Sequence, residues 1–499
     1  MSRVNTFIVN IIKSNNIIQT AQFVFGLLFA VLIAYLLATD NLLWAACLLA
    51  FPIIAIIVHR YPFISIMVWL LLSPFLTFTK TVPSRMLYWG IHRALPPATI
   101  IVIIIVTILM INKRRLPKLG FAELSMLGYV VVSILSIYLL NPSPQATFYL
   151  FYDRVISPMF LYLVIRLYSP NQKDIQVVLP IVFFIAVSQS IFGMLSWAAP
   201  GLLPKDWLGL AGQRTTGSLV NTTVYTATLM FSGLILLQAG LNQRSRVVRN
   251  IFIAAFIMCL ISVFLSFSRA SWLGGVVVLI GLAFLYPNFI IRMSTTLVII
   301  SLLFGAVISV RFSWVFDWAN ERLYSEQATN SALSRLPVFY AAVRMFAEKP
   351  VFGWGYGNFD LYDRQYQAQI EGLVGDDKDH ASHNFFLTLI AEQGAVGFLL
   401  FTGPVFYWLG QTIKKAKRMP SAGLFNFKLP IMLWLVMLNE AILVNFSNLR
   451  VVFGWGIWWV TLGMIAAMVS SAPRRARERT TPVEKQIKVD TPYQQTVLR

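Results

Sequence analysis

The sequence predicts an all-α polytopic membrane protein. Of its 499 residues, 58% are hydrophobic, and the mean hydropathy of +0.71 is far above what the core of a water-soluble chain requires. Apolar runs long enough to cross a bilayer recur along the chain, for example Pro96–Ile111 and Ser271–Leu285. Clusters of lysine and arginine between some of these runs indicate which side of the membrane faces the cytoplasm.

Segmenting the chain by hydropathy predicts about fourteen transmembrane helices, centred near residues 30, 50, 70, 104, 130, 158, 187, 231, 259, 279, 303, 396, 438 and 461. An even number places both termini on one side of the membrane. Four basic clusters fall on that same side, which makes it the cytoplasm and predicts a bacterial inner-membrane protein. The clusters are Lys113–Lys118, Arg244–Arg249, Lys414–Arg418 and Arg474–Arg479.

The connections divide the chain into regions. We expect a cytoplasmic N-terminus over residues 1–20, retained because no small-residue cleavage site precedes the first apolar run. N-terminal transmembrane helices follow over 21–212, then a core over 213–410, C-terminal transmembrane helices over 411–470 and a disordered basic cytoplasmic tail over 471–499. The core contains one long extracytoplasmic loop over 313–382, between the eleventh and twelfth spans, and long loops on a rigid scaffold usually carry function.

Composition excludes several kinds of chemistry. The chain lacks a P-loop, a dinucleotide fingerprint, an HExxH and a Cys-x-x-Cys sequence, so we expect no cofactor and no resident metal. Its two cysteines, Cys47 and Cys259, lie within apolar runs, where thiolate chemistry is disfavoured. Most of the net charge of +20 is explained by cytoplasmic lysine and arginine, so it does not indicate a nucleic-acid partner.

One basic segment breaks the positive-inside trend. The predicted outward loop Thr79–Leu95 carries Lys80, Arg85 and Arg93 and no acidic residue. Cations kept on the outer face favour an anionic ligand such as phosphate, and contact with lipid headgroups is the alternative.

The long loop contains a predicted helix over about Ser334–Glu348, followed by a turn rich in glycine. Val338, Ala341, Ala342 and Met345 recur at helical spacing, as in a helix that lies on the membrane surface or caps a cavity. Arg335 stands near the helix N-terminus, where the dipole disfavours a cation, so a compensating anion is expected. A surface salt bridge to Glu321 or Glu326 is the alternative.

Two more arginines stand at predicted span ends. Arg214 lies in a loop of hydroxyl and amide side chains, and Arg269 lies among serines in a very short link between two spans. A guanidinium at membrane depth is costly unless it faces a polar cavity or an anion, so Arg269 is a candidate functional residue. Snorkelling to headgroups is the alternative.

An ionisable ring opens the span after the long loop. In a chain with four histidines, His383 and Asn384 precede an apolar helix that continues through Thr388 and Glu392. At 100° per residue His383 and Glu392 lie on opposite faces, so Glu392 orients His383 only if the helix breaks. A neutral imidazole there can take a proton from a hydroxyl, a charged one can bind phosphate, and helix capping is the alternative.

Four pieces in this order resemble the O-antigen ligase and polymerase superfamily. They are R-x-x-G-S (Arg214–Ser218), S-x-S-R-A-S-W-L-G (Ser266–Gly274), S-R followed by a helix and P-V-F-G-W-G-Y-G-N-F (Ser334–Phe359), and H-N-F-F-L-T-L-I-A-E-Q-G-A-V-G (His383–Gly397). Each motif alone is weakly specific, whereas the ordered set, which spans roughly Arg214 to Leu400, is more so.

The resemblance implies a metal-independent membrane glycosyltransferase of polysaccharide biosynthesis, with its active site on the extracytoplasmic face. Such enzymes move a glycan from an undecaprenyl-pyrophosphate carrier to a hydroxyl of an acceptor, which is lipid A core for ligases and another glycan for polymerases. By motif, Arg214, Arg269 and Arg335 would bind pyrophosphate, and His383 with Arg269 would act in catalysis. Asn384, Lys80, Arg85 and Arg93 are possible secondary residues, and direct attack would invert the anomeric configuration.

Three alternatives remain open from the sequence. The segment Gly375–His380 contains Asp376, Asp377 and Asp379, which could hold a divalent ion or form a solvated loop. A transporter of a small anion or solute would use Glu440 as its intramembrane ionisable residue. A scaffold without catalysis would need none of the outer arginines.

Overall fold

In the computed structural model, every secondary-structure element of the described residues is helical. The structure describes residues 30–32, 34–35, 38–39, 56–76, 81–108, 117–208, 214–311, 313–324, 333, 335–367, 384–446 and 452–472. Within them, 8 helices are long and apolar enough to cross a membrane, and two shorter apolar helices, Ile64–Phe75 and Arg269–Leu285, accompany them. The all-helical fold with several membrane-crossing helices is therefore confirmed. The number fourteen stays a prediction. The spans expected near residues 30 and 50 lie mostly outside the described residues, and the helices near residues 303 and 438, Pro287–Arg311 and Lys428–Val444, are in neither of these two groups.

The helices follow the predicted centres from residue 70 onward. In chain order they are α3 (Ile64–Leu72), α4 (Val82–Tyr88), α5 (Leu95–Ile108), α6 (Phe121–Leu140), α7 (Pro144–Phe151), α8 (Ser157–Tyr168), α9 (Gln172–Ala198), α10 (Thr222–Leu241), α11 (Arg246–Phe264), α12 (Arg269–Leu285), α13 (Pro287–Arg311), α14 (Ser313–Tyr324), α16 (Leu336–Glu348), α17 (Phe359–Tyr366), α18 (Phe385–Lys415), α19 (Lys428–Val444) and α20 (Val452–Ser471).

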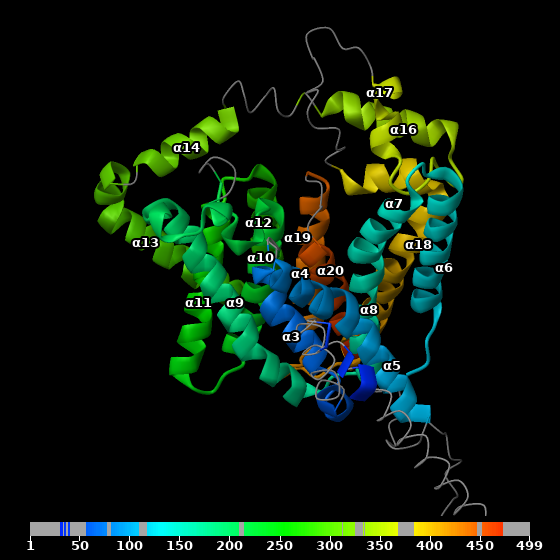
Figure 1. Cartoon of the computed structure of the whole chain (residues 1–499). Helices are drawn as coiled ribbons and strands as arrows, with labels where there is room; N and C mark the ends of the chain where they lie inside the picture. Colours follow the sequence, from blue (N-terminus) through cyan, green and yellow to red (C-terminus); the bar gives the residue numbers. More distant parts are fainter. Residues whose placement is uncertain are drawn as a thin grey trace, which may run out of the picture.

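Two almost wholly buried helices, α10 and α20, form the centre of the bundle. Helix α10 packs against α9, α11 and α19, and α20 packs against α8, α18 and α19. In Figure 1, α11 and α13 lie on one flank and α6 and α18 on the other, with α19 and α20 between them. Helices α14, α16 and α17 gather at one end of the bundle, which we call the loop end.

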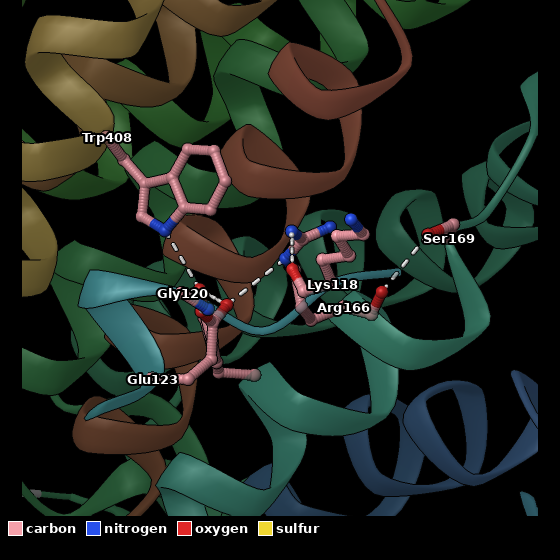
Figure 2. A network of polar contacts seen from close by, with 7 residues as sticks. Lys118, Gly120, Glu123, Arg166, Ser169 and Trp408 are labelled. Carbon is pink, nitrogen blue, oxygen red and sulfur yellow. Dashed lines mark hydrogen bonds and ion pairs between the residues drawn. The ribbon is translucent and has the colours of Figure 1, made fainter. Parts of the chain in front are cut away.

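The basic connections lie at the opposite end. The turn between α10 and α11 and the segment between α18 and α19, which carry two of the predicted clusters, are both found there in Figure 1. A buried network holds the same end together, as Figure 2 shows. Glu123 accepts hydrogen bonds from Tyr162 Oη at 2.9 Å and Arg166 Nε at 3.1 Å, and Trp408 Nε1 donates to Tyr162 Oη at 2.8 Å. These contacts join α6, α8 and α18.

The segment Thr79–Leu95 differs from the predicted loop. A helix begins at Val82 and continues through a π-helical turn, η2 (Trp89–Ala94), into α5. Thr81 starts it with a capping box, in which its side chain accepts from Ser84 N, and Pro83 lies in the first turn. The prediction of a loop was therefore wrong, because a good N-cap outweighs a run of charged and polar residues.

The long loop contains the predicted helix. Helix α16 begins within two residues of the expected start, and Val338, Ala341, Ala342 and Met345 are buried, as their spacing predicted. This face packs against Phe359 and the first turns of α18, so α16 covers another part of the chain.

Candidate functional site

The segment Arg214–Ser218 is tied to α9 by a serine and a glycine. The Ser218 hydroxyl donates to the Pro74 carbonyl at 2.8 Å and accepts from Gln189 Nε2 at 2.7 Å, while Gln189 Oε1 accepts from Ser218 N. Gly217 has a φ of +53°, and a Cβ there would lie 2.4 Å from Gln189 Oε1. The two residues therefore fix the path of the chain between Arg214 and α10.

The same segment contacts the link that leads to Arg269. The Thr215 hydroxyl donates to the Leu265 carbonyl at 3.2 Å, and Thr226 and Ser271 share a hydrogen bond of 2.9 Å between α10 and α12. Ser268 caps α12, so the exposed Arg269 is the first residue of that helix. The structure thus brings the surroundings of Arg214 and Arg269 together at the loop end.

Arg335 joins this region from the long loop. It is half-buried at the N-cap of α16, and its Nη1 donates to the Phe446 carbonyl at 3.4 Å, just after α19. Helix α19 packs against α10 and α12. Arg214, Arg269 and Arg335 therefore stand at the loop ends of neighbouring helices.

Asn384 caps α18. Its Oδ1 accepts from Leu387 N at 3.0 Å, and its carbonyl accepts from the Thr388 hydroxyl. His383, the predicted proton acceptor, lies outside the described residues. Asn384 nevertheless fixes where the chain enters α18, beside the central helix α20, because the rings of its neighbour Phe385 and of Trp455 on α20 are 4.5 Å apart.

Helix α18 breaks at Gly394, where the expected helix runs on without interruption. This residue has a φ of 61° and a ψ of −165°, which separates a first part, Phe385–Gln393, from a second, Ala395–Lys415. The left-handed φ favours glycine, and a Cβ would lie 2.3 Å from the Val351 carbonyl oxygen. The break places Thr388 and Glu392 on a short helix of their own.

The segment Pro350–Phe359 fills the break, and we call it the clamp. Its backbone pairs with the groups that the interrupted helix leaves free, so the helix loses few hydrogen bonds at the break. The bonds run from Ala395 N to Pro350 O at 2.8 Å, from Val396 N to Val351 O at 3.1 Å, from Trp354 N to Ala391 O at 3.0 Å and from Gly355 N to Glu392 O at 2.7 Å.

Buried polar side chains complete the clamp. Glu392, 8% exposed, accepts from Phe359 N at 3.0 Å. Asn358, fully buried, donates to the Leu140 carbonyl and accepts from Asn141 Nδ2 at 2.6 Å. The sequence analysis did not single out Asn141, although an asparagine directly after a span is a signal for a side chain that hydrogen-bonds to a distant segment at the helix end. The clamp thus connects α6, α17 and α18.

An apolar groove lies beside the break. Its volume is about 400 Å³, and the residues that line it are all hydrophobic: Phe346, Phe386, Leu387, Ile390, Ala395, Phe398 and Leu399. These residues come from α16 and both parts of α18. The groove is therefore suited to a hydrocarbon chain.

The secondary candidates have different surroundings. Arg85 is exposed on α4, and Lys80 lies outside the described residues. Arg93 is half-buried and makes a bidentate ion pair with Asp153, with both N–O distances 2.6 Å. Arg93 is thus already neutralised by a carboxylate, which its position in a predicted loop did not indicate.

The two carboxylate candidates also differ. Glu440 is 3% exposed on α19, and neither carboxylate oxygen has a hydrogen-bond partner. The segment Gly375–His380 lies outside the described residues. Among the residues that are described, no group of three His, Cys, Asp or Glu side chains forms a metal site.

A family model described as O-antigen ligase matches residues 253–402. The match confirms the resemblance to the O-antigen ligase and polymerase superfamily over this part of the chain, which contains Arg269, Arg335, His383 and the clamp. It ends close to the expected limit, Leu400, and begins after Arg214. It supports a membrane glycan-transferring function in polysaccharide biosynthesis. No curated protein matches the chain.

Proposed function

We propose that this protein transfers a glycan from a polyprenyl-pyrophosphate carrier to an acceptor hydroxyl at the loop end. The observation that carries the proposal is the grouping of Arg214, Arg269 and Arg335 at the ends of neighbouring helices, within a region whose core matches the O-antigen ligase family. Arginine binds phosphate oxygens in a bidentate manner and remains charged at the membrane surface.

The transfer reaction is a displacement at the anomeric carbon of the donor glycan. The acceptor oxygen forms a bond to the anomeric carbon as the bond from that carbon to the phosphate oxygen breaks, and the polyprenyl diphosphate leaves as an anion. Arginines that hold the departing phosphates stabilise the developing charge. His383 takes the proton of the acceptor hydroxyl, and a single displacement inverts the anomeric configuration.

The apolar groove supports the lipid part of the donor. Its hydrophobic lining beside α18 suits an isoprenoid chain, while the arginines at the loop end suit the diphosphate head. The carrier would then bind with its chain along α18 and its head toward α12 and α19, and the acceptor would approach from the side of Asn384.

The test is a transfer assay with the purified full chain in nanodiscs. The reactants are a polyprenyl-pyrophosphate glycan with candidate lipid and glycan acceptors, and the variants are Arg269→Ala and His383→Ala. Arg246→Gln removes one positive charge at the opposite end of the bundle and serves as the control. We expect acceptor-dependent loss of the donor in wild type and control, reduced about a hundredfold or more in both site variants.

The products separate the finer possibilities. A ladder of products indicates a polymerase, a single addition to a lipid acceptor indicates a ligase, and a chelator should leave the rate unchanged. Binding of donor without transfer to any acceptor would contradict the proposal. The partnerless carboxylate of Glu440 would then favour transport, tested by flux of a small anion with Glu440→Gln.

A further inference from the structure

Two π-helical turns face each other in the N-terminal half of the bundle. One is η2 (Trp89–Ala94), and the other is η3 (Tyr152–Ile156), between α7 and α8. Such turns are rare and are often found at functional sites. Both lie outside the range that the family model matches.

His92 and Arg93, both in η2, hydrogen-bond to Asp153 in η3. Trp69 Nε1 donates to His92 Nδ1 at 3.2 Å, so His92 Nε2 carries the proton and donates to the Asp153 carbonyl at 3.0 Å. Arg93 binds the Asp153 carboxylate through two atoms. The Ser157 hydroxyl donates to the His92 carbonyl. Because Asp153 is committed to Arg93, it does not neutralise its neighbour Arg154.

The helical segment that carries Arg154, α7 with η3, contacts the clamp. Thr147 and Phe151 lie four residues apart on one face of it. A Cβ at Gly357 would lie 2.8 Å from Thr147 Cγ2, and the rings of Phe151 and Tyr356 are 4.8 Å apart. Arg154 follows three residues after Phe151, within η3 and deeper in the span. It lies close enough to Tyr356 for its charge to oppose the rise in the pKa of Tyr356 that burial causes.

The guanidinium of Arg154 has no strong partner in the part of the chain that the structure describes. Neither the ion pair Arg93–Asp153 nor the ion pair Arg166–Glu123 includes Arg154, and no hydrogen bond joins Arg154 to another described residue. The buried carboxylate of Glu392 accepts through Oε1 from Phe359 N, and no ion pair joins it to Arg154 in the part of the chain that the structure describes. A half-buried guanidinium at membrane depth without a bonded acid is costly unless an anion binds it.

We propose that Arg154 is a further anion-binding residue, which presents its guanidinium beneath the clamp to a phosphate or carboxylate group of a substrate. The inference rests on the proposed function for the identity of that substrate. Two substrates carry such an anionic group: the donor carries a diphosphate, and an acceptor with an acidic sugar carries a carboxylate. Arg154 lies three residues after Phe151, whose ring meets Tyr356 of the clamp, whereas Arg269 is the first residue of α12.

The test measures binding rather than transfer. The full chain in nanodiscs is titrated with farnesyl diphosphate, which represents the donor head, and with a trisaccharide that bears one glucuronic acid. The same trisaccharide with its carboxyl group reduced is the neutral comparison. The variants are Arg154→Gln and Arg154→Lys, with Arg246→Gln as the control that removes one distant charge. Thermal unfolding of each variant shows that it is folded.

We expect Arg154→Gln to weaken the binding of one anionic probe about tenfold or more, and Arg154→Lys to weaken it less, because lysine keeps the charge without the planar fork. Loss for farnesyl diphosphate identifies the donor, and loss for the acidic trisaccharide alone identifies the acceptor. Equal binding by wild type and Arg154→Gln for both probes would overturn the inference, as would a wild type that binds neither at millimolar concentration. Arg154-dependent binding without any transfer would leave the inference standing and reject the proposed function.

Discussion

Glu392 connects the clamp to the short first part of α18 through one buried oxygen. In Glu392→Ala, the Phe359 N–H loses its acceptor, and we expect the free energy of unfolding to fall by about 1–3 kcal/mol. Glu392→Gln keeps an oxygen in that place and should lose less than half as much. Thermal unfolding in nanodiscs measures both. Equal loss in the two variants would mean that the charge, and not the hydrogen bond, holds the clamp.

At this scale the sequence predicted the arginines better than their partners. Arg214, Arg269 and Arg335 stand out because a cation near an outer span end is unusual in any membrane protein. The pairing of Arg93 with Asp153, or of Asn141 with Asn358, joins residues 60 and 217 positions apart. No local pattern encodes such a pair, so Arg93 was predicted to contact an anionic ligand or lipid headgroups, whereas the carboxylate of Asp153 neutralises it.

The clamp needs glycine where its backbone lies against the backbone of α18. At Gly353, φ is +66°, and a Cβ would lie 2.4 Å from the Glu392 carbonyl carbon. We expect Gly353→Ala to lower the free energy of unfolding by about 2 kcal/mol or more, and to expose the segment Pro350–Phe359 to proteolysis. Gly410→Ala on α18, where nothing lies within 4 Å of the added carbon, is the control and should be neutral or slightly stabilising. Unchanged proteolysis in Gly353→Ala would contradict the role of the clamp.

The apolar groove offers a second test on α18. Ile390→Trp fills part of the 400 Å³ space, so we expect kcat/KM for a long-chain polyprenyl donor to fall about tenfold through KM. A donor with a short isoprenoid chain should be used as before. Leu409→Trp, an exposed position farther along the same helix and outside the lining of the groove, is the matched control. The same loss for both donors would show that the tryptophan distorts α18 rather than excludes the chain.

The network in Figure 2 holds three helices together at the end opposite the clamp. Glu123→Ala leaves Arg166, 6% exposed, without its carboxylate, and we expect the free energy of unfolding to fall by about 3–5 kcal/mol. The double variant Glu123→Leu with Arg166→Met removes both charges and should recover most of that loss. If thermal unfolding finds the double variant as unstable as the single one, packing around the pair, and not the isolated charge, explains the effect.

Element by element, the sequence predicted helices wherever a long apolar run or a clear face was present. Helix α16 was predicted within two residues at its start because four small or apolar residues recur on one face. The break at Gly394 was not predicted, because glycine within an apolar helix is common in membranes and only the clamp, supplied by a distant segment, makes the left-handed conformation favourable here.

For the whole molecule, hydropathy was sufficient for the all-helical membrane fold and for placing two of the predicted basic clusters, Arg244–Arg249 and Lys414–Arg418, at one end. Successive connections lie at alternate ends of the bundle, because each span is long enough to cross the membrane once and the next span must return. How the helices pack around α10 and α20 did not follow, because nearly all spans are apolar on every side and hydropathy therefore identifies no neighbour for any of them.

The helix bundle has a predicted orientation in the membrane. We expect the loop end to face away from the cytoplasm, because the basic clusters Arg244–Arg249 and Lys414–Arg418 lie at the other end. The chain has 2 cysteines, so a variant with Cys47→Ala and Cys259→Ala provides an unreactive background. In that background, Lys205→Cys reports on the loop end and Gln243→Cys on the opposite end, and both positions are exposed. A membrane-impermeant maleimide should label Lys205→Cys in spheroplasts and Gln243→Cys only after permeabilisation. The reverse pattern would place the arginines on the cytoplasmic side, where a transfer to extracytoplasmic acceptors has no substrate.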